Sequence, residues 1–173
     1  IESDTADDYT FYSAATDWRS AGGEWTITSR WPCMPNWSWY GGSSNEAAVL
    51  WSKRSYHGDQ VVDLHAATMM TGGKVRREVP SGYLKFGDIN LTICSDGVRL
   101  DSGYTLMLGG FGNSRTCLWR RGRIVAERND RLYPTKDHHR TWRNVRAEKI
   151  GSEIRFLFND ELILSYKDPN PIP

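Results

Sequence analysis

An all-β fold, with two antiparallel sheets packed as a sandwich, is predicted by three features of the sequence. Helical periodicity is nearly absent along the 173 residues. Short runs of alternating polar and apolar residues recur instead, separated by Gly, Asn, Asp or Pro. Three short segments suit tight hairpin turns: Arg121-Gly122, Ile150-Gly151-Ser152 and Asn159-Asp160. So many strands need two sheets to bury their apolar faces.

The expected strands follow one another with short connections. In the first half they span residues 23–29, 46–53, 59–70 and 88–95. In the second half they span 103–111, 116–122, 123–129, 142–150, 152–160 and 161–168. Alternation within these runs places five residues on the inner faces: Val49, Val62, Leu91, Leu106 and Phe156. Residues 71–87 and 128–141 are expected to be exposed excursions between strands.

Size and charge exclude several classes of protein. A chain of this length fits one well-buried domain, expected over 1–173. The formal net charge is +1, which argues against nucleic-acid binding, because that function usually needs a strongly basic face. No apolar run is long enough to span a bilayer. The first residues lack the basic and apolar regions of a signal peptide.

The stretch "WPCMPNWSWYGGSS", residues 31–44, is unusually aromatic for a loop. Its Pro and Gly residues exclude a helix and are poorly suited to a central strand. We predict that its aromatic side chains form a stacking surface for a sugar ring; the alternative is that they plug the end of the core. The expected ligand contacts are Trp31, Trp37, Trp39 and Tyr40, joined by the loop histidines His138 and His139.

Carboxylates and histidines on strands are candidates for acid–base chemistry. Glycosidases need two carboxylates across the scissile bond, and a histidine beside a carboxylate can serve as a base. Asp63 and His65 lie two residues apart, so they share one face of a strand. The catalytic candidates are His65, Asp63, Glu46 and Glu148. The alternative is that these acids are solvated or form turns.

Three cysteines, Cys33, Cys94 and Cys117, show no CxxC spacing and no Cys/His cluster. This excludes the usual structural zinc site. One disulfide with one free thiol remains open, without a choice of pair. Cys94 and Cys117 lie in expected strands and are interpreted as small buried apolar residues.

The order of several segments resembles a known group of proteins. These are "GEWTI", "AAVLWSKRSYHGDQVVDLHA", "INLTICSDG", "SGYTLMLGGFGNSRTCLWRRGRIVAE" and "HRTWRNVRAEKIGSEIRFLFNDELILSYKDPNPIP". They resemble the concanavalin A-like, laminin G-like jelly rolls of bacterial glycan-processing proteins, including 3-keto-disaccharide hydrolase domains. The resemblance covers the chain from about Trp18 onward. It implies a jelly-roll β-sandwich and a carbohydrate partner, and a location outside the cytoplasm or in the secreted fraction.

The resemblance also implies a structural calcium ion, for which Asp96, Asp101 and Asp168 are the candidate ligands. Such domains usually close with one more strand after a "D-x-x-P" segment, whereas this chain ends at Pro173. We therefore expect a closing strand from outside the chain, either from a longer precursor or from a second chain.

Two functions remain open at this point. The first is carbohydrate recognition, as a glycan-binding module or as the sugar-handling domain of a glycoside hydrolase or lyase. The second is a structural or assembly role, in which the aromatic surface and an open sheet edge contact other proteins. An enzyme would need converging carboxylates or a histidine, whereas a binding module needs only exposed aromatic and polar groups.

Overall fold

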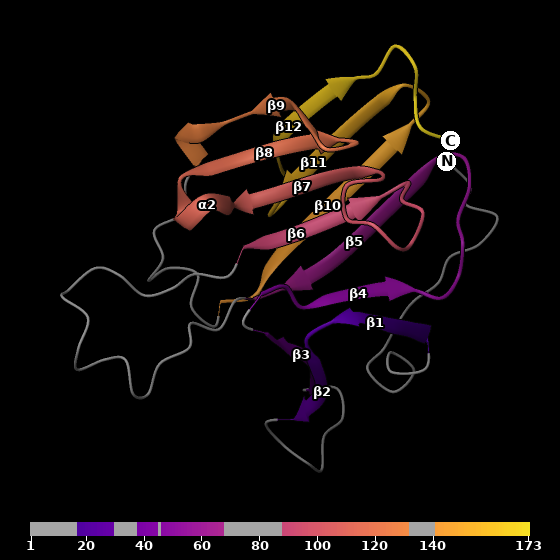
Figure 1. Cartoon of the computed structure of the whole chain (residues 1–173). Helices are drawn as coiled ribbons and strands as arrows, with labels where there is room; N and C mark the ends of the chain where they lie inside the picture. The colour runs from indigo at the N-terminus through magenta and orange to yellow at the C-terminus, as the bar shows by residue number, and fades with distance from the viewer. Residues whose placement is uncertain (1–16, 30–37, 45, 68–87, 132–140) are drawn as a thin grey trace. The chain divides into compact units, whose positions relative to one another are not determined.

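The described residues of the computed structural model are 17–29, 38–44, 46–67, 88–131 and 141–173. They form strands and almost no helix, as the sequence predicts (Figure 1). Their contacts divide into two compact units, Ile1–Ser55 and Tyr56–Pro173, and each is described by itself. Among the described residues, no helix has the length and apolar character needed to cross a membrane.

The smaller unit contains two antiparallel pairs of strands. In one pair, β1 (Trp18–Gly22) lies beside β4 (Val49–Ser52), and in the other β2 (Glu24–Ser29) lies beside β3 (Ser38–Ser43). Val49 is half-buried in β4 of this unit, opposite Gly22, and its place on an inner face of the sandwich stays a prediction.

The expectation of a loop through residue 40 is wrong for the last part of the aromatic stretch, which forms β3. Strand β3 accommodates the Gly41-Gly42 pair because Trp25 of the neighbouring strand β2 packs over it. A Cβ atom at Gly42 would lie 2.7 Å from the indole ring of Trp25. The Trp25 Nε1–H donates to the carbonyl of Gly22 at 3.0 Å. Glycine therefore admits the ring where a side chain would exclude it.

The larger unit contains two four-stranded antiparallel sheets, one in front of the other in Figure 1. The first has the order β12-β11-β10-β5, and the second has the order β6-β7-β8-β9. The bounds are β5 Gln60–Ala66, β6 Ile89–Ile93, β7 Tyr104–Gly109, β8 Arg115–Arg120, β9 Arg123–Glu127, β10 Arg143–Ile150, β11 Glu153–Phe158 and β12 Glu161–Lys167. A short helix, α2 (Gly110–Asn113), joins β7 to β8, and a 3-10 turn, η3 (Asn129–Arg131), follows β9.

The core lies between these two sheets and follows the predicted alternation. Leu91, Leu106 and Phe156 are buried in it, and Val62 packs against it half-buried. Other members are Ile93, Tyr104, Leu108, Leu118, Val145, Ala147, Ile154, Phe158, Ile163, Leu164 and Ile172. Burial of these side chains is the main stabilising term of the unit.

The three predicted hairpin turns are confirmed. Positive φ angles occur at Arg121 (45°), Gly122 (76°), Gly151 (55°), Asn159 (48°) and Asp160 (63°). These turns join β8 to β9, β10 to β11 and β11 to β12. Their backbone twist matches that of the paired strands, which fixes the register of each hairpin.

The segment after β12, "DPNPIP", closes one end of the sandwich. Its prolines have no N–H, so only Asp168, Asn170 and Ile172 carry backbone donors. All three donors are used. They bond to the Ser152 carbonyl at 2.8 Å, the Asp168 Oδ1 at 2.9 Å and the Tyr104 hydroxyl at 2.9 Å, respectively. Ile172 enters the core. The expected closing strand from outside the chain stays a prediction, as does the single domain over 1–173.

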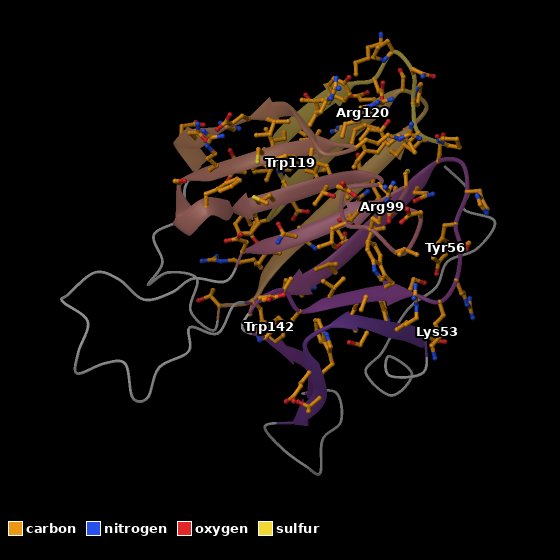
Figure 2. The ribbon with its side chains drawn as sticks, in the orientation of Figure 1. Lys53, Tyr56, Arg99, Trp119, Arg120 and Trp142 are labelled. Carbon is orange, nitrogen blue, oxygen red and sulfur yellow. The ribbon has the colours of Figure 1, made fainter. Side chains whose placement is uncertain are left out.

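A buried polar cluster holds this segment in place. The side chain of Asp168 is 2% exposed, and its Oδ2 accepts hydrogen bonds from the Tyr104 hydroxyl and from Arg120 Nε. The Nη2 of Arg120, which is labelled in Figure 2, also donates to the Asn170 carbonyl at 2.6 Å. Strands β7 and β8 of one sheet are thereby joined to the end of β12 in the other.

The cluster shifts the acidity of its members. Burial alone would raise the pKa of Asp168, but the hydrogen bonds from Tyr104 and Arg120 outweigh it and leave this pKa below its ordinary value. Burial, together with the hydrogen bond to Asp168, raises the pKa of Tyr104 to about 12. Both shifts favour the charged carboxylate and the neutral phenol at neutral pH.

We predict that Tyr104→Phe lowers the free energy of unfolding by about 1–3 kcal/mol, because a buried carboxylate loses a donor and a buried N–H loses its acceptor. The Tyr104 contribution is fully present below its unfolded pKa of about 10 and is lost as pH rises toward 12. Urea unfolding of both proteins should therefore show a stability difference that narrows above pH 10. A difference that is constant across this range would contradict the assigned role of the phenol.

Candidate functional site

Polar side chains gather on the face of sheet β12-β11-β10-β5 that points away from the core. Strand β10 alternates, with Val145 and Ala147 in the core and the residues between them on the opposite face. Register pairs Arg146 with Asp63 and Glu148 with Arg155 across the neighbouring strands. We call this set of side chains the arginine face; it comprises Asp63, His65, Asn144, Arg146, Glu148 and Arg155.

Glu148 lies at the centre of the arginine face and holds two guanidinium groups. Its side chain is only 8% exposed. Arg146 Nε donates to Oε1 at 2.8 Å, and Arg155 Nη1 forms an ion pair with Oε2 at 3.3 Å. The two arginine side chains are themselves 36% and 38% exposed. A buried carboxylate therefore fixes two guanidinium groups that still reach the surface.

Asp63 extends the network toward the edge strand β5. Its Oδ2 lies 3.5 Å from Arg146 Nη1, and its Oδ1 accepts a hydrogen bond from Asn144 Nδ2. Two buried acceptors on this face, Asn144 Oδ1 and Glu148 Oε2, receive no hydrogen bond from the described part of the chain. Glu148 Oε2 is nevertheless held by its ion pair with Arg155.

Three of the four catalytic candidates predicted from sequence meet on this face: Asp63, His65 and Glu148. His65 is exposed on β5, opposite Asn144 in the register. Glu46 belongs to the smaller unit, where it is exposed and its N–H bonds to Ser44 Oγ at 3.0 Å. Catalytic carboxylates must flank a substrate bond, whereas here Arg146 contacts both Asp63 and Glu148. The arrangement suits ligand binding better than acid–base catalysis.

The predicted aromatic ligand contacts are only partly within the described residues. Trp31, Trp37, His138 and His139 lie outside them. The backbones of Trp39 and Tyr40 lie in β3, opposite Thr28 and Ile27 of β2. Their role as a stacking surface stays a prediction.

The three predicted calcium ligands have other partners. Asp96 Oδ1 accepts the backbone N–H groups of Arg99 at 2.8 Å and Val98 at 2.9 Å, and these bonds lower the pKa of Asp96 to about 2. Asp101 is exposed, 3.9 Å from Arg99 Nε. Asp168 belongs to the buried cluster with Tyr104. Within the described ranges no three His, Cys, Asp or Glu side chains are grouped to hold a metal ion. The calcium site stays a prediction.

Cys94 and Cys117 are both free thiols, and Cys33 lies outside the described residues. The prediction of a small buried residue is confirmed for Cys117, whereas Cys94 is half-buried. Burial raises the pKa of both thiols. They are therefore protonated at neutral pH and weak nucleophiles.

Sequence reasoning missed the most informative residues of the site, which are the two arginines and Asn144. A signal for them exists in "WRNVRAEKI": Asn144, Arg146 and Glu148 alternate with apolar residues along one strand. Three polar residues with this spacing must share a face. Arg155 could be added only with knowledge of the register of β11.

Comparisons with known proteins bear on the fold. No protein-family model matches the chain, and no curated protein matches it. A similar solved structure is the carbohydrate binding module CBM66 from Bacillus subtilis, with a TM-score of 0.58 and 17% sequence identity. The likeness covers 90% of this chain and 82% of that one. Together with the two antiparallel sheets, it confirms the predicted jelly-roll β-sandwich.

We predict that Glu148→Gln lowers the free energy of unfolding by about 1–3 kcal/mol, because hydrogen bonds to charged groups are among the stronger ones and two guanidinium groups lose their counter-charge. Glu153→Gln is a matched control. This glutamate is exposed on β11 of the same sheet, and its change should stay within about 0.5 kcal/mol. Chemical denaturation measures both. Equal effects of the two substitutions would show that Glu148 does not organise the arginines.

Proposed function

We propose that this protein binds carbohydrate through the arginine face. One observation carries the proposal: a buried carboxylate fixes two partly exposed guanidinium groups on the outer face of the sheet, with Asp63 and Asn144 beside them. Sugar hydroxyl groups both donate and accept hydrogen bonds. Guanidinium donors and carboxylate or amide acceptors in fixed positions are complementary to them. The structural likeness to a carbohydrate binding module supports the same ligand class.

Preorganisation supports binding at this site. An arginine side chain free in solvent loses rotamer entropy when it binds a ligand, whereas Arg146 and Arg155 are already held by Glu148. The fixed spacing of their N–H groups then selects for ligands whose hydroxyl oxygens have a matching spacing. The arginine face therefore discriminates by geometry.

Charge balance on the face indicates a neutral glycan. Arg146 and Arg155 carry two positive charges, and Asp63 and Glu148 carry two negative charges. A uronate or sulfate group would have to compete with these carboxylates for the guanidinium groups. A neutral sugar meets no such competition, so neutral glycans should bind better than anionic ones.

The proposal covers a binding module first, and a sugar-handling domain of a glycan-degrading protein second. We also propose a location outside the cytoplasm, since neutral glycans occur there as ligands. If the protein had an assembly role instead, it would bind other proteins and no glycan. The glycan array described below distinguishes these two functions.

A glycan array of neutral and acidic oligosaccharides, probed with the full chain, tests the proposal and identifies the ligand. We predict that Arg155→Ala weakens binding of that glycan about tenfold, which is about 1.4 kcal/mol, because a fixed charged donor is lost. Arg146 remains to pair with Glu148, so the fold should be retained. Calorimetry measures the affinity.

Arg99→Ala is the matched control, because Arg99 is an exposed arginine on the loop between β6 and β7 (Figure 2). It should bind as the unchanged protein does. Loss of affinity in both variants would indicate a general charge effect. Full affinity in Arg155→Ala would place the binding site elsewhere, and an array without any bound glycan would reject carbohydrate binding.

The aromatic stretch supplies a further prediction within the same proposal. If Trp39 stacks on a sugar ring, Trp39→Ala should weaken glycan binding by on the order of 1 kcal/mol, the scale of an aromatic contact beyond burial. Calorimetry and thermal unfolding of this variant are read together. Unchanged affinity with a large loss of stability would show that Trp39 serves the packing of the smaller unit.

A further inference from the structure

An exposed phenylalanine occupies a strained turn between β7 and β8. Phe111 has a φ angle of 54°, and it follows Gly109 with a φ of 70°. Its side chain is 58% exposed. Gly110 lies between them, and a Cβ there would lie 2.1 Å from the sulfur of Met107, so a larger residue would displace that side chain. The turn is thus tightly built, and yet it carries a large apolar ring at its surface.

The strain at Phe111 is offset only weakly by the contact of its ring with the Arg115 guanidinium group at the surface. Bulky side chains disfavour the left-handed region of backbone space, where glycine or asparagine would fit without strain. The other described non-glycine residues in this region are Cys94 and three turn residues of tight hairpins, Arg121, Asn159 and Asp160. An exposed ring also gains little from burial. Strain that persists at an exposed aromatic residue is a reason to look for a ligand.

The ring has a fixed polar neighbourhood. The guanidinium carbon of Arg115 lies 5.7 Å from the ring centroid of Phe111. Arg115 Nε lies 3.5 Å from Glu127 Oε1, and the same oxygen accepts a hydrogen bond from Asn129 Nδ2 at 2.9 Å. A guanidinium group thus lies beside an exposed aromatic ring and is linked through a carboxylate to an amide. These residues come from β8, β9 and the turn after β9.

We propose that Phe111, Arg115 and Glu127 form a second carbohydrate contact site, distinct from the arginine face, that takes one neutral sugar ring. The C–H face of the sugar packs on the open side of the Phe111 ring. Its hydroxyl groups accept from Arg115 and donate to Glu127. The inference rests on the proposed function for its ligand class, but it depends on no residue of the arginine face.

The chemistry of the neighbours favours a sugar over an apolar peptide. A proline-rich apolar segment would use the ring but, because proline has no N–H, would present mainly carbonyl acceptors to the polar groups. A sugar hydroxyl uses the donor and the acceptor alike, and Arg115 and Glu127 balance each other in charge. The two proposed sites lie on different sheets, since α2 and β8 belong to the front layer of Figure 1, whereas β10 and β11 lie in the layer behind.

The test is a titration of the full chain, followed by nuclear magnetic resonance, with the methyl glycosides of glucose, galactose, mannose and fructose as probes. At least one probe should shift the Arg115 Nε–H and Phe111 ring signals. Phe111→Gly should diminish the Arg115 shift at a given probe concentration and weaken that binding up to about tenfold, the range of one aromatic contact. Because glycine relieves the strained φ angle, this variant should be at least as stable to denaturant as the unchanged protein. Phe111→Trp should keep the site.

Val98→Ala is the control for loss of an exposed apolar side chain, since Val98 is 69% exposed on the loop between β6 and β7. It should leave the shifts unchanged.

Shifts at Arg155 without shifts at Arg115 would overturn the second site and leave the proposed function intact. Shifts at Arg115 alone, unaffected by Arg155→Ala, would support the second site and reject the arginine face. An Arg115 shift that is undiminished in a folded Phe111→Gly would overturn the role of the ring.

Discussion

The buried carboxylate of Asp168 is the constraint on which the sandwich of the larger unit depends. Two stacked sheets are held together mainly by non-directional apolar contacts, which tolerate sliding. Asp168 adds directional bonds at one end: it follows β12 of one sheet and accepts hydrogen bonds from Tyr104 on β7 and Arg120 on β8 of the other. A buried charge without such partners would be strongly unfavourable, so the sheets are held in the arrangement that supplies them.

With the core fixed in this way, the opposite face of sheet β12-β11-β10-β5 is free to carry polar groups. Strand β10 shows how strict the division is, because Val145 and Ala147 point inward and Arg146 and Glu148 point outward. Lys149 is the exception, as it is buried on the core side near the strand end. Its ammonium group donates to the Gly58 carbonyl at 3.1 Å, which supplies a partner for the charge.

Local patterns predicted most of the larger unit, because its strands alternate and its turns use residues that accept positive φ. The strands that were missed, β1 and β3, lack this local signature. In β3 the Gly41-Gly42 pair reads as a loop, and only the indole of Trp25 on a neighbouring strand explains it. Site residues follow the same rule. The resemblance implies that Asp168 is a calcium ligand, which stays a prediction, whereas its hydrogen-bond partners in the structure, Tyr104 and Arg120, are 64 and 48 residues away in sequence. Such partners are fixed by the fold, and no local pattern reveals them.

Both proposed sites share an energetic signature that distinguishes them from the core. Glu148 is almost fully buried on a face that points away from the core, where it fixes two partly exposed guanidinium groups. Phe111 is strained and exposed, although glycine would suit its turn better. Neither feature is needed to hold the sheets together, since apolar burial and the Asp168 cluster do that. Groups that are ordered against their own local preference are preorganised for a ligand, which then gains the interactions without having to order them. On this reasoning the two proposed sites differ in their cost to the fold: replacement of Glu148 should lower both glycan binding and the free energy of unfolding, whereas replacement of Phe111 by glycine should lower binding alone.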